Sequence, residues 1–158
     1  SNYVISAIAK HEAEAAGYVE CVYLDAVEHK YFQEGSSCNI FFVMKDGTLV
    51  TPELGDTILP GITRKSVIAL AKEAGMKVEE RAVSVDEVFE NAAEFFVTGT
   101  AAGISPMSSL TDLNGRKVVF GDGKEGPVAH KLQHLLKGRQ YGLLDDPNNW
   151  NTVVIAGK

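Results

Sequence analysis

The sequence predicts a single α/β domain, of the α+β type, in which mostly antiparallel strands are flanked by helices. Three segments place apolar residues at helical spacing, and short strand-like runs with glycine-containing turns lie between them. The chain has 158 residues, the size of one domain with a substantial core, and it shows no repeat and no long linker.

The first predicted element is an amphipathic helix over residues 4–16. Its apolar residues Ile5, Ile8 and Ala9 fall on one stripe, and Gly17 suits the left-handed position that ends a helix. A tight turn is expected at Asp46-Gly47. The strands predicted in this half of the chain are residues 21–24, 31–34, 39–44 and 49–51.

Predicted helices and strands also alternate in the second half of the chain. A second helix is predicted from Pro60 to Lys72, because Val67, Ile68 and Ala71 repeat at helical spacing. A capping box, in which Ser84 is followed three residues later by Glu87, predicts a short helix. The other predicted elements are strands over residues 77–83, 94–98, 104–107 and 118–120, and a last helix that begins at Gly126-Pro127.

Composition and charge exclude several classes of partner. The formal net charge is −6 and the basic residues are scattered, which argues against nucleic acid, since such a binding face needs clustered positive charge. No run approaches the roughly 20 apolar residues of a membrane helix, so no membrane partner is expected. Cys21 and Cys38 are expected to be free thiols in a reducing compartment. His130 and His134 have zinc-like spacing, but no third ligand accompanies them, so no metal site is predicted.

Three short segments carry the residue types of a pocket for a phosphorylated cofactor: residues 34–41, 59–64 and 98–102. The middle segment opens a helix with Gly-Ile-Thr, where free N–H groups bind phosphate and a glycine lets the backbone approach it. The third ends a strand with Gly-Thr, which offers a hydroxyl and a backbone N–H, and Glu34 in the first is a possible partner for a cation. Asn39 is interpreted as architectural. Taken alone, the first segment is more often a solvated strand end, the second a capped helix start and the third a plain turn.

The order and spacing of these segments resemble the signature of the class IV, or fold type IV, pyridoxal phosphate-dependent aminotransferases. The matching positions are Glu34, Ser36, Asn39, Ile40-Phe41, Leu49-x-Thr51 and Leu59-x-Gly61-Ile62-x-Arg64. The resemblance covers residues 1 to about 150 and is strongest to the branched-chain amino-acid aminotransferases. It implies that the sheet is the mostly antiparallel pseudo-barrel of the large domain of that fold.

The resemblance also implies the roles of individual residues. The implied cofactor-binding residues are Tyr3, Glu34, Leu59, Ile62, Thr63 and Thr100. Glu34 would pair with the pyridine nitrogen, Tyr3 with the phenolic oxygen, and Leu59 would lie on the ring face. The start of the second helix would hold the phosphate together with the hydroxyl of Thr100. The backbone N–H of Ala101 would help to bind the substrate carboxylate.

The activity implied by the resemblance is transamination of Leu, Ile and Val with 2-oxoglutarate, in a homodimer. The lysine that binds pyridoxal 5'-phosphate covalently is expected just upstream of Ser1. Residues 1–158 are therefore expected to be the C-terminal cofactor-binding domain, without the small N-terminal domain, and to be inactive alone. A D-amino-acid transaminase, an aminodeoxychorismate lyase or a non-catalytic binding or assembly domain stay open. A cytoplasmic location is expected, and organelle targeting stays open.

Overall fold

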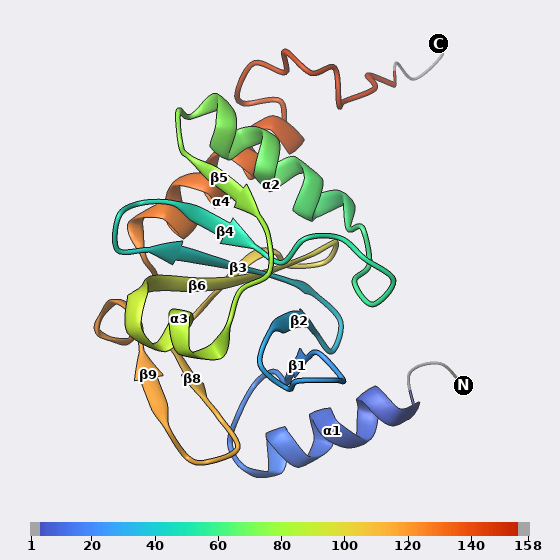
Figure 1. Ribbon diagram of the computed structural model, residues 1–158. Helices are drawn as coiled ribbons and strands as arrows, with labels where there is room; N and C mark the ends of the chain where they lie inside the picture. The colour runs from blue at the N-terminus through green and yellow to red at the C-terminus, as the bar shows by residue number, and fades with distance from the viewer. Residues whose placement is uncertain (1–3, 155–158) are drawn as a thin grey trace.

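The computed structural model describes residues 4–154 of the chain (Figure 1). The helices of this part are α1 (Val4–Ala15), α2 (Ile62–Glu73), α3 (Val85–Asn91) and α4 (Pro127–Gln140), with a 3-10 turn at Gly121–Gly123. Its strands are β1 (Val22–Leu24), β2 (Phe32–Gly35), β3 (Asn39–Met44), β4 (Leu49–Thr51), β5 (Val78–Glu80), β6 (Ala92–Gly99), β7 (Gly103–Met107), β8 (Ser109–Thr111) and β9 (Lys117–Val119). None of the helices in the described part is long and apolar enough to cross a membrane.

The central sheet confirms the predicted α+β class with mostly antiparallel strands flanked by helices. In the described residues its strand order is β5-β4-β3-β6-β7, and every neighbouring pair is antiparallel except β4 and β5. The pairs β1–β2 and β8–β9 form separate two-stranded ribbons. The central strand β3 is buried along its whole length, which explains its nearly continuous apolar run.

Two apolar layers lie on the two faces of this sheet. Phe41 of β3 stacks on Phe96 of β6 at 5.2 Å between ring centroids, in the layer that α2 and α4 cover. Their neighbours in the two strands, Phe42 and Phe95, face the other side of the sheet. They stack at 5.0 Å between ring centroids in the layer that β2, α3 and β9 cover. Side chains of a strand alternate between faces, so the aromatic pairs serve both layers. Figure 1 shows α2 and α4 together on one side of the sheet and α1 beyond the β1–β2 ribbon on the other.

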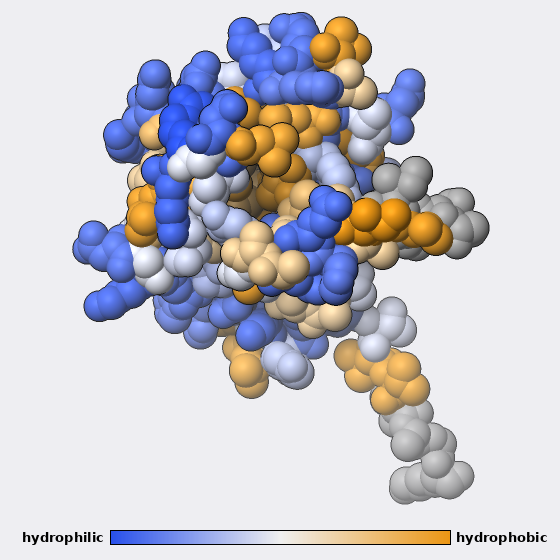
Figure 2. Space-filling model, turned by 90° about the horizontal axis from the view of Figure 1, so that it is seen from below, coloured by the Kyte–Doolittle hydropathy of each residue, from blue (hydrophilic) through white to orange (hydrophobic). Residues whose placement is uncertain are grey.

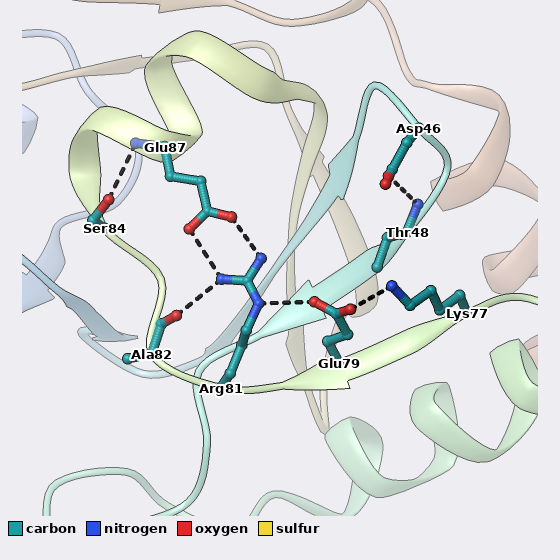
Figure 3. A network of polar contacts seen from close by, with 8 residues as sticks. All are labelled: Asp46, Thr48, Lys77, Glu79, Arg81, Ala82, Ser84 and Glu87. Atoms are coloured by element: carbon teal, nitrogen blue, oxygen red, sulfur yellow. Dashed lines mark hydrogen bonds and ion pairs between the residues drawn. The ribbon is translucent and has the colours of Figure 1, made fainter.

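The structure corrects two details of the predicted elements. β5 ends at Glu80 rather than residue 83, because the chain then crosses to β2, where the carbonyl of Val83 accepts the N–H of Phe32 at 2.9 Å. Only half of the capping box forms: Ser84 Oγ accepts the N–H of Glu87, whose carboxylate instead pairs with Arg81 (Figure 3).

The first helix forms as predicted and ends at Ala15. Within its predicted apolar stripe, Ile8 is 57% exposed, whereas Ala9 and Ala13 are half-buried. Exposed apolar side chains continue into the segment after the helix, at Tyr18 and Val19. Figure 2 views the molecule from this side and shows apolar side chains gathered around a hollow. Exposed apolar surface of this kind is typical of faces that bind another protein surface or a ligand.

Candidate functional site

The structure brings the first two predicted segments together at the backbone of Leu59. The carboxylate Oε2 of Glu34, on β2, accepts the N–H of Leu59 at 2.9 Å. The amide Nδ2 of Asn39, at the start of β3, donates to the carbonyl of Leu59 at 2.8 Å. The backbone N–H and carbonyl of Leu59 are thus both bonded by side chains of sheet strands. The side chain of Leu59 is 68% exposed as a result, and it is presented to solvent from a well-held backbone.

The glycine before α2 is needed for a close approach. Gly61 has an ordinary φ of −62°, and a Cβ built on it would lie 2.2 Å from Asn39 Oδ1. Its small size therefore lets Asn39 reach across to this loop, and close approach of the backbone to an anion, which the sequence suggested, stays a prediction. Asn39 itself has the architectural role that was predicted for it.

The start of α2 is open in the described structure. No side chain caps the helix, and Ile62 at its first position is 77% exposed, with Thr63 half-buried beside it. The first N–H groups of a helix have no partner within the helix, and they carry the positive end of its dipole. This end of α2 can therefore accept an anionic group.

The third segment reaches the same place through β6. Thr98 is paired with Asn39 in the ladder between β3 and β6, and a Cβ on Gly99 would lie 3.8 Å from the carbonyl of Ser37. Thr100 and Ala101 follow in the exposed turn between β6 and β7. The end of β2, the start of α2 and this turn are thus organised around Asn39.

The last helix provides an internal comparison for α2. α4 also begins after a glycine, but its start is occupied by the buried side chain of Glu94, from β6. The two carboxylate oxygens accept the N–H groups of Val128 and Ala129, each at 3.0 Å. α3 is capped by Ser84. Unlike these two helix starts in the described structure, that of α2 is filled by no side chain, which fits a site for an external phosphate.

The remaining groups at the site fit an aromatic cofactor. Among the described residues, only Oε2 of Glu34 takes a hydrogen bond, so Oε1 is left for a ligand donor. The exposed apolar side chains at the site are those of Leu59, whose backbone bonds this carboxylate, and of Ile62, the first residue of α2. A carboxylate, an apolar surface and an anion site match a cationic ring that carries a phosphate. Tyr3, the remaining predicted cofactor contact, lies outside the described residues.

A cavity of about 360 Å³ lies elsewhere, on α4 and the segment that follows it. Its lining comprises His130, Gln133, His134, Lys137, Gly138, Tyr141, Leu143 and Leu144. None of the predicted site residues contributes to it. The two histidines that sequence analysis set aside as metal ligands thus line a groove apart from the candidate site.

Comparison with known proteins places the chain in a family. A family model described as amino-transferase class IV matches residues 1–110. The chain is 46% identical over 158 residues to a "Probable branched-chain-amino-acid aminotransferase" of Staphylococcus aureus strain N315, covering 97% of this chain and 44% of that protein. It is 47% identical over 149 residues to "Branched-chain-amino-acid aminotransferase 3, chloroplastic" of Arabidopsis thaliana, covering 94% of this chain and 35% of that protein.

Solved structures give the same result. The branched-chain amino acid aminotransferase of Escherichia coli superposes with a TM-score of 0.82 at 39% identity, over 94% of this chain and 47% of that one. The enzyme of Thermobaculum terrenum in its PLP-form superposes with a TM-score of 0.73 at 33% identity, over 89% and 43%. The chain spans less than half the length of these relatives. On the family match and these relatives, the chain belongs to the class IV aminotransferases.

Proposed function

We propose that this chain is the cofactor-binding domain of a pyridoxal phosphate-dependent transaminase, which exchanges amino groups between branched-chain L-amino acids (Leu, Ile and Val) and 2-oxoglutarate. The observation that carries the proposal is the uncapped start of α2, fixed beside Glu34 through the backbone of Leu59. The cofactor named for the Thermobaculum terrenum structure supports the cofactor assignment, and the names of the relatives support the substrate class.

Phosphate would be bound by backbone N–H groups at the start of α2 and by a hydroxyl in the turn after β6. The N–H groups of Ile62 and Thr63 point from the uncapped helix start, where the helix dipole favours an anion. The exposed hydroxyl of Thr100, in the turn after β6, adds a further donor. Because these donors belong to an ordered helix and a sheet turn, they need little rearrangement to bind a phosphate.

The ring is held by residues of β2 and of the loop before α2. The free oxygen of Glu34 would accept a hydrogen bond from the ring nitrogen and so keep a proton at that atom. Bound pyridoxal phosphate supplies an electron sink for the substrate carbanion. The side chain of Leu59 would cover a ring face and exclude water there, and Tyr3, which lies outside the described residues, would bond the phenolic oxygen as the family resemblance implies. The N–H of Ala101 orients the substrate carboxylate.

The catalytic lysine and part of the substrate pocket are expected outside residues 1–158. The lysine that would join the cofactor covalently and move the substrate proton is expected in sequence before Ser1, and a smaller domain would complete the substrate pocket. This chain alone is accordingly inactive. The complete protein acts as a homodimer on small amino acids and 2-oxo acids, with neither nucleic acid nor membrane as a partner, and the cytoplasm is its proposed compartment.

Absorption spectroscopy of the full-length protein tests this function. Pyridoxal phosphate is added first and should give the visible band of a covalently attached cofactor, and L-leucine should then convert it to the pyridoxamine form while D-alanine does not. The variant Glu34→Gln should convert at least about 100-fold more slowly, in line with losses of charged catalytic contacts.

Glu53→Gln is the matched control, because Glu53 is an exposed carboxylate in the loop before α2, and its rate should equal that of the unsubstituted protein. Conversion by D-alanine in place of L-leucine would move the protein to a sister activity of the same class. Failure to bind pyridoxal phosphate at all would refute the catalytic proposal and favour a non-catalytic domain.

A further inference from the structure

One buried carboxylate near the site takes no part in the proposed contacts with the cofactor. Glu20 lies between α1 and β1, and its side chain is only 12% exposed. Its Oε1 accepts the N–H of Cys21 at 2.9 Å, and both the N–H and the hydroxyl of Ser36, at 3.1 and 2.5 Å. Its Oε2 lies 3.7 Å from Cys38 Sγ and 4.0 Å from Lys10 Nζ. A carboxylate removed from water needs such donors, and Ser36 and Cys38, both in one turn, make three of these contacts.

The turn that Glu20 holds is tightly folded. The N–H of Gly35 donates to the carbonyl of Cys38 at 2.8 Å, which closes the turn. A Cβ on Gly35 would lie 2.4 Å from Cys38 Sγ and 3.5 Å from Glu20 Cγ, so no larger residue fits between them. The N–H of Ser36 is also shared with the carbonyl of Cys21, at 3.0 Å, which ties the turn to β1. The contacts of Glu20 with Ser36 and Cys38 therefore stabilise this turn.

The two residues that flank this turn are the ones that fix the candidate site. Glu34 precedes the turn and accepts the N–H of Leu59, and Asn39 follows it and donates to the carbonyl of Leu59. A displacement of the turn would shift both contacts together. Groups that contact a reacting ring must be held within a fraction of an ångström of their working geometry. A small displacement of such a group therefore lowers binding and rate.

We infer that Glu20 is a positioning residue for the cofactor: its buried carboxylate, acting through Ser36, fixes the orientation in which Glu34 meets the pyridine nitrogen. The inference rests on the proposed function and assigns a role to a residue that does not contact the cofactor itself. The N–H and hydroxyl of Ser36 donate to Glu20 rather than to water. The turn, and with it the position of the Glu34 carboxylate, is therefore fixed before a ligand binds.

Binding of pyridoxamine 5'-phosphate to the full-length protein tests the inference, because this ligand binds without a covalent bond. Glu20→Gln keeps the size of the side chain and should weaken binding by about tenfold, a typical coupling between groups in one network. In a Glu34→Gln background, the same change should have less than about a twofold effect, since the positioned group is already altered. Glu14→Gln, an exposed glutamate of α1, is the matched control and should bind as the unsubstituted protein does.

Alkylation of Cys38 gives a second readout that is independent of the cofactor. Burial, followed by the negative charge of Glu20, raises the pKa of this thiol to about 12, and the thiolate is the reactive species. Glu20→Gln should therefore speed alkylation of Cys38 by iodoacetamide at pH 8 at least about fivefold, read by peptide mass spectrometry. Glu34→Gln should leave that rate unchanged, and an unchanged rate in Glu20→Gln would contradict the contact between Glu20 and Cys38 on which the inference rests.

The outcomes separate this inference from the function on which it rests. Unchanged binding in Glu20→Gln, or an equal loss with and without Glu34, would overturn the positioning role alone. Failure of the unsubstituted protein to bind pyridoxamine 5'-phosphate would overturn the proposed function and the positioning role together.

Discussion

Single carboxylates hold much of the irregular backbone of this chain. Asp25 closes the loop between β1 and β2, Glu20 supports the turn between β2 and β3, and Glu94 occupies the start of α4. Each accepts at least two backbone N–H groups, and bonds from charged acceptors are stronger than those between neutral groups. The residues around the candidate site are therefore positioned by charge-assisted contacts as well as by apolar packing.

Asp25 is the clearest example with a pH dependence. Its carboxylate accepts the N–H groups of Val27, Glu28, Lys30 and Tyr31 at 3.2, 2.6, 2.8 and 2.8 Å, and these bonds, led by that of Tyr31, hold the pKa of this carboxyl well below its usual range. A carboxyl whose pKa is lowered by folding stabilises the protein at pH values above its pKa in the unfolded chain. This stabilisation is lost as the pH falls from that pKa toward the lower pKa of the folded state.

We expect Asp25→Asn to lower the urea midpoint at pH 7 and to remove part of the stability loss between about pH 4.5 and 2.5, because the carboxylate no longer titrates. Urea unfolding of the full-length protein at several pH values measures both effects. Asp56→Asn, a change at an exposed aspartate before α2, should leave the midpoint within experimental error. A parallel pH profile for Asp25→Asn and the unsubstituted protein would show that these bonds do not stabilise the fold.

At the scale of elements, ion pairs join segments that the sheet does not. Arg81, just after β5, pairs with Glu79 at 2.8 Å and with Glu87 of α3 at 2.5 Å, and Lys77 extends the chain of charges (Figure 3). The strong ion pairs raise the pKa of Arg81 and so favour its charged form. This arrangement fixes α3 against the edge strand, and it explains why Glu87 does not complete the capping box.

The start of α4 joins a helix to a strand in a similar way. A Cβ on Gly126 would lie 2.0 Å from the Cδ of Glu94 and 2.2 Å from its Oε2, so the glycine leaves room for the carboxylate that caps the helix. Pro127 then fits the first helical position. The Gly-Pro pair thus marks a helix start whose N–H groups are already occupied.

Substitutions at this helix start should be costly. Glu94→Gln should destabilise the protein by about 1–2 kcal/mol through loss of the charged cap, and Gly126→Ala by about 1–3 kcal/mol through overpacking. Gly55→Ala is the matched control, since a Cβ there meets nothing within 4 Å, and it should change stability by less than about 0.5 kcal/mol. Urea unfolding of the full-length protein measures these values. Equal stability of Gly126→Ala and Gly55→Ala would contradict the close contact.

At the scale of the whole molecule, local sequence patterns predicted most of the fold. β3 and β4 have the predicted bounds, because an apolar run and an Asp-Gly turn define them locally. The last helix begins at Pro127, as the Gly-Pro pair indicated. β5 was predicted too long, because the crossing of its chain toward β2 depends on a bond to Phe32, which is distant in sequence.

The candidate site was predictable only in part, for the same reason. Glu34, Leu59 and the start of α2 stand in a motif with fixed spacing, and the structure brings them together. The roles of Glu20 and Glu94 could not be predicted, because their partners lie 16 and 35 residues away and no spacing rule connects them. The exposure of Ile8 on α1 was likewise not predictable, because a helical pattern specifies which residues share a face but not what packs against that face.

A crystal structure of the full-length protein with pyridoxal phosphate tests the central claim most directly. We expect the phosphate within hydrogen-bonding distance of the N–H groups of Ile62 and Thr63 and of the hydroxyl of Thr100, with the ring nitrogen at the carboxylate of Glu34. A phosphate bound instead in the groove of α4 that His130 and Lys137 line, or a ring nitrogen without contact to Glu34, would contradict the account.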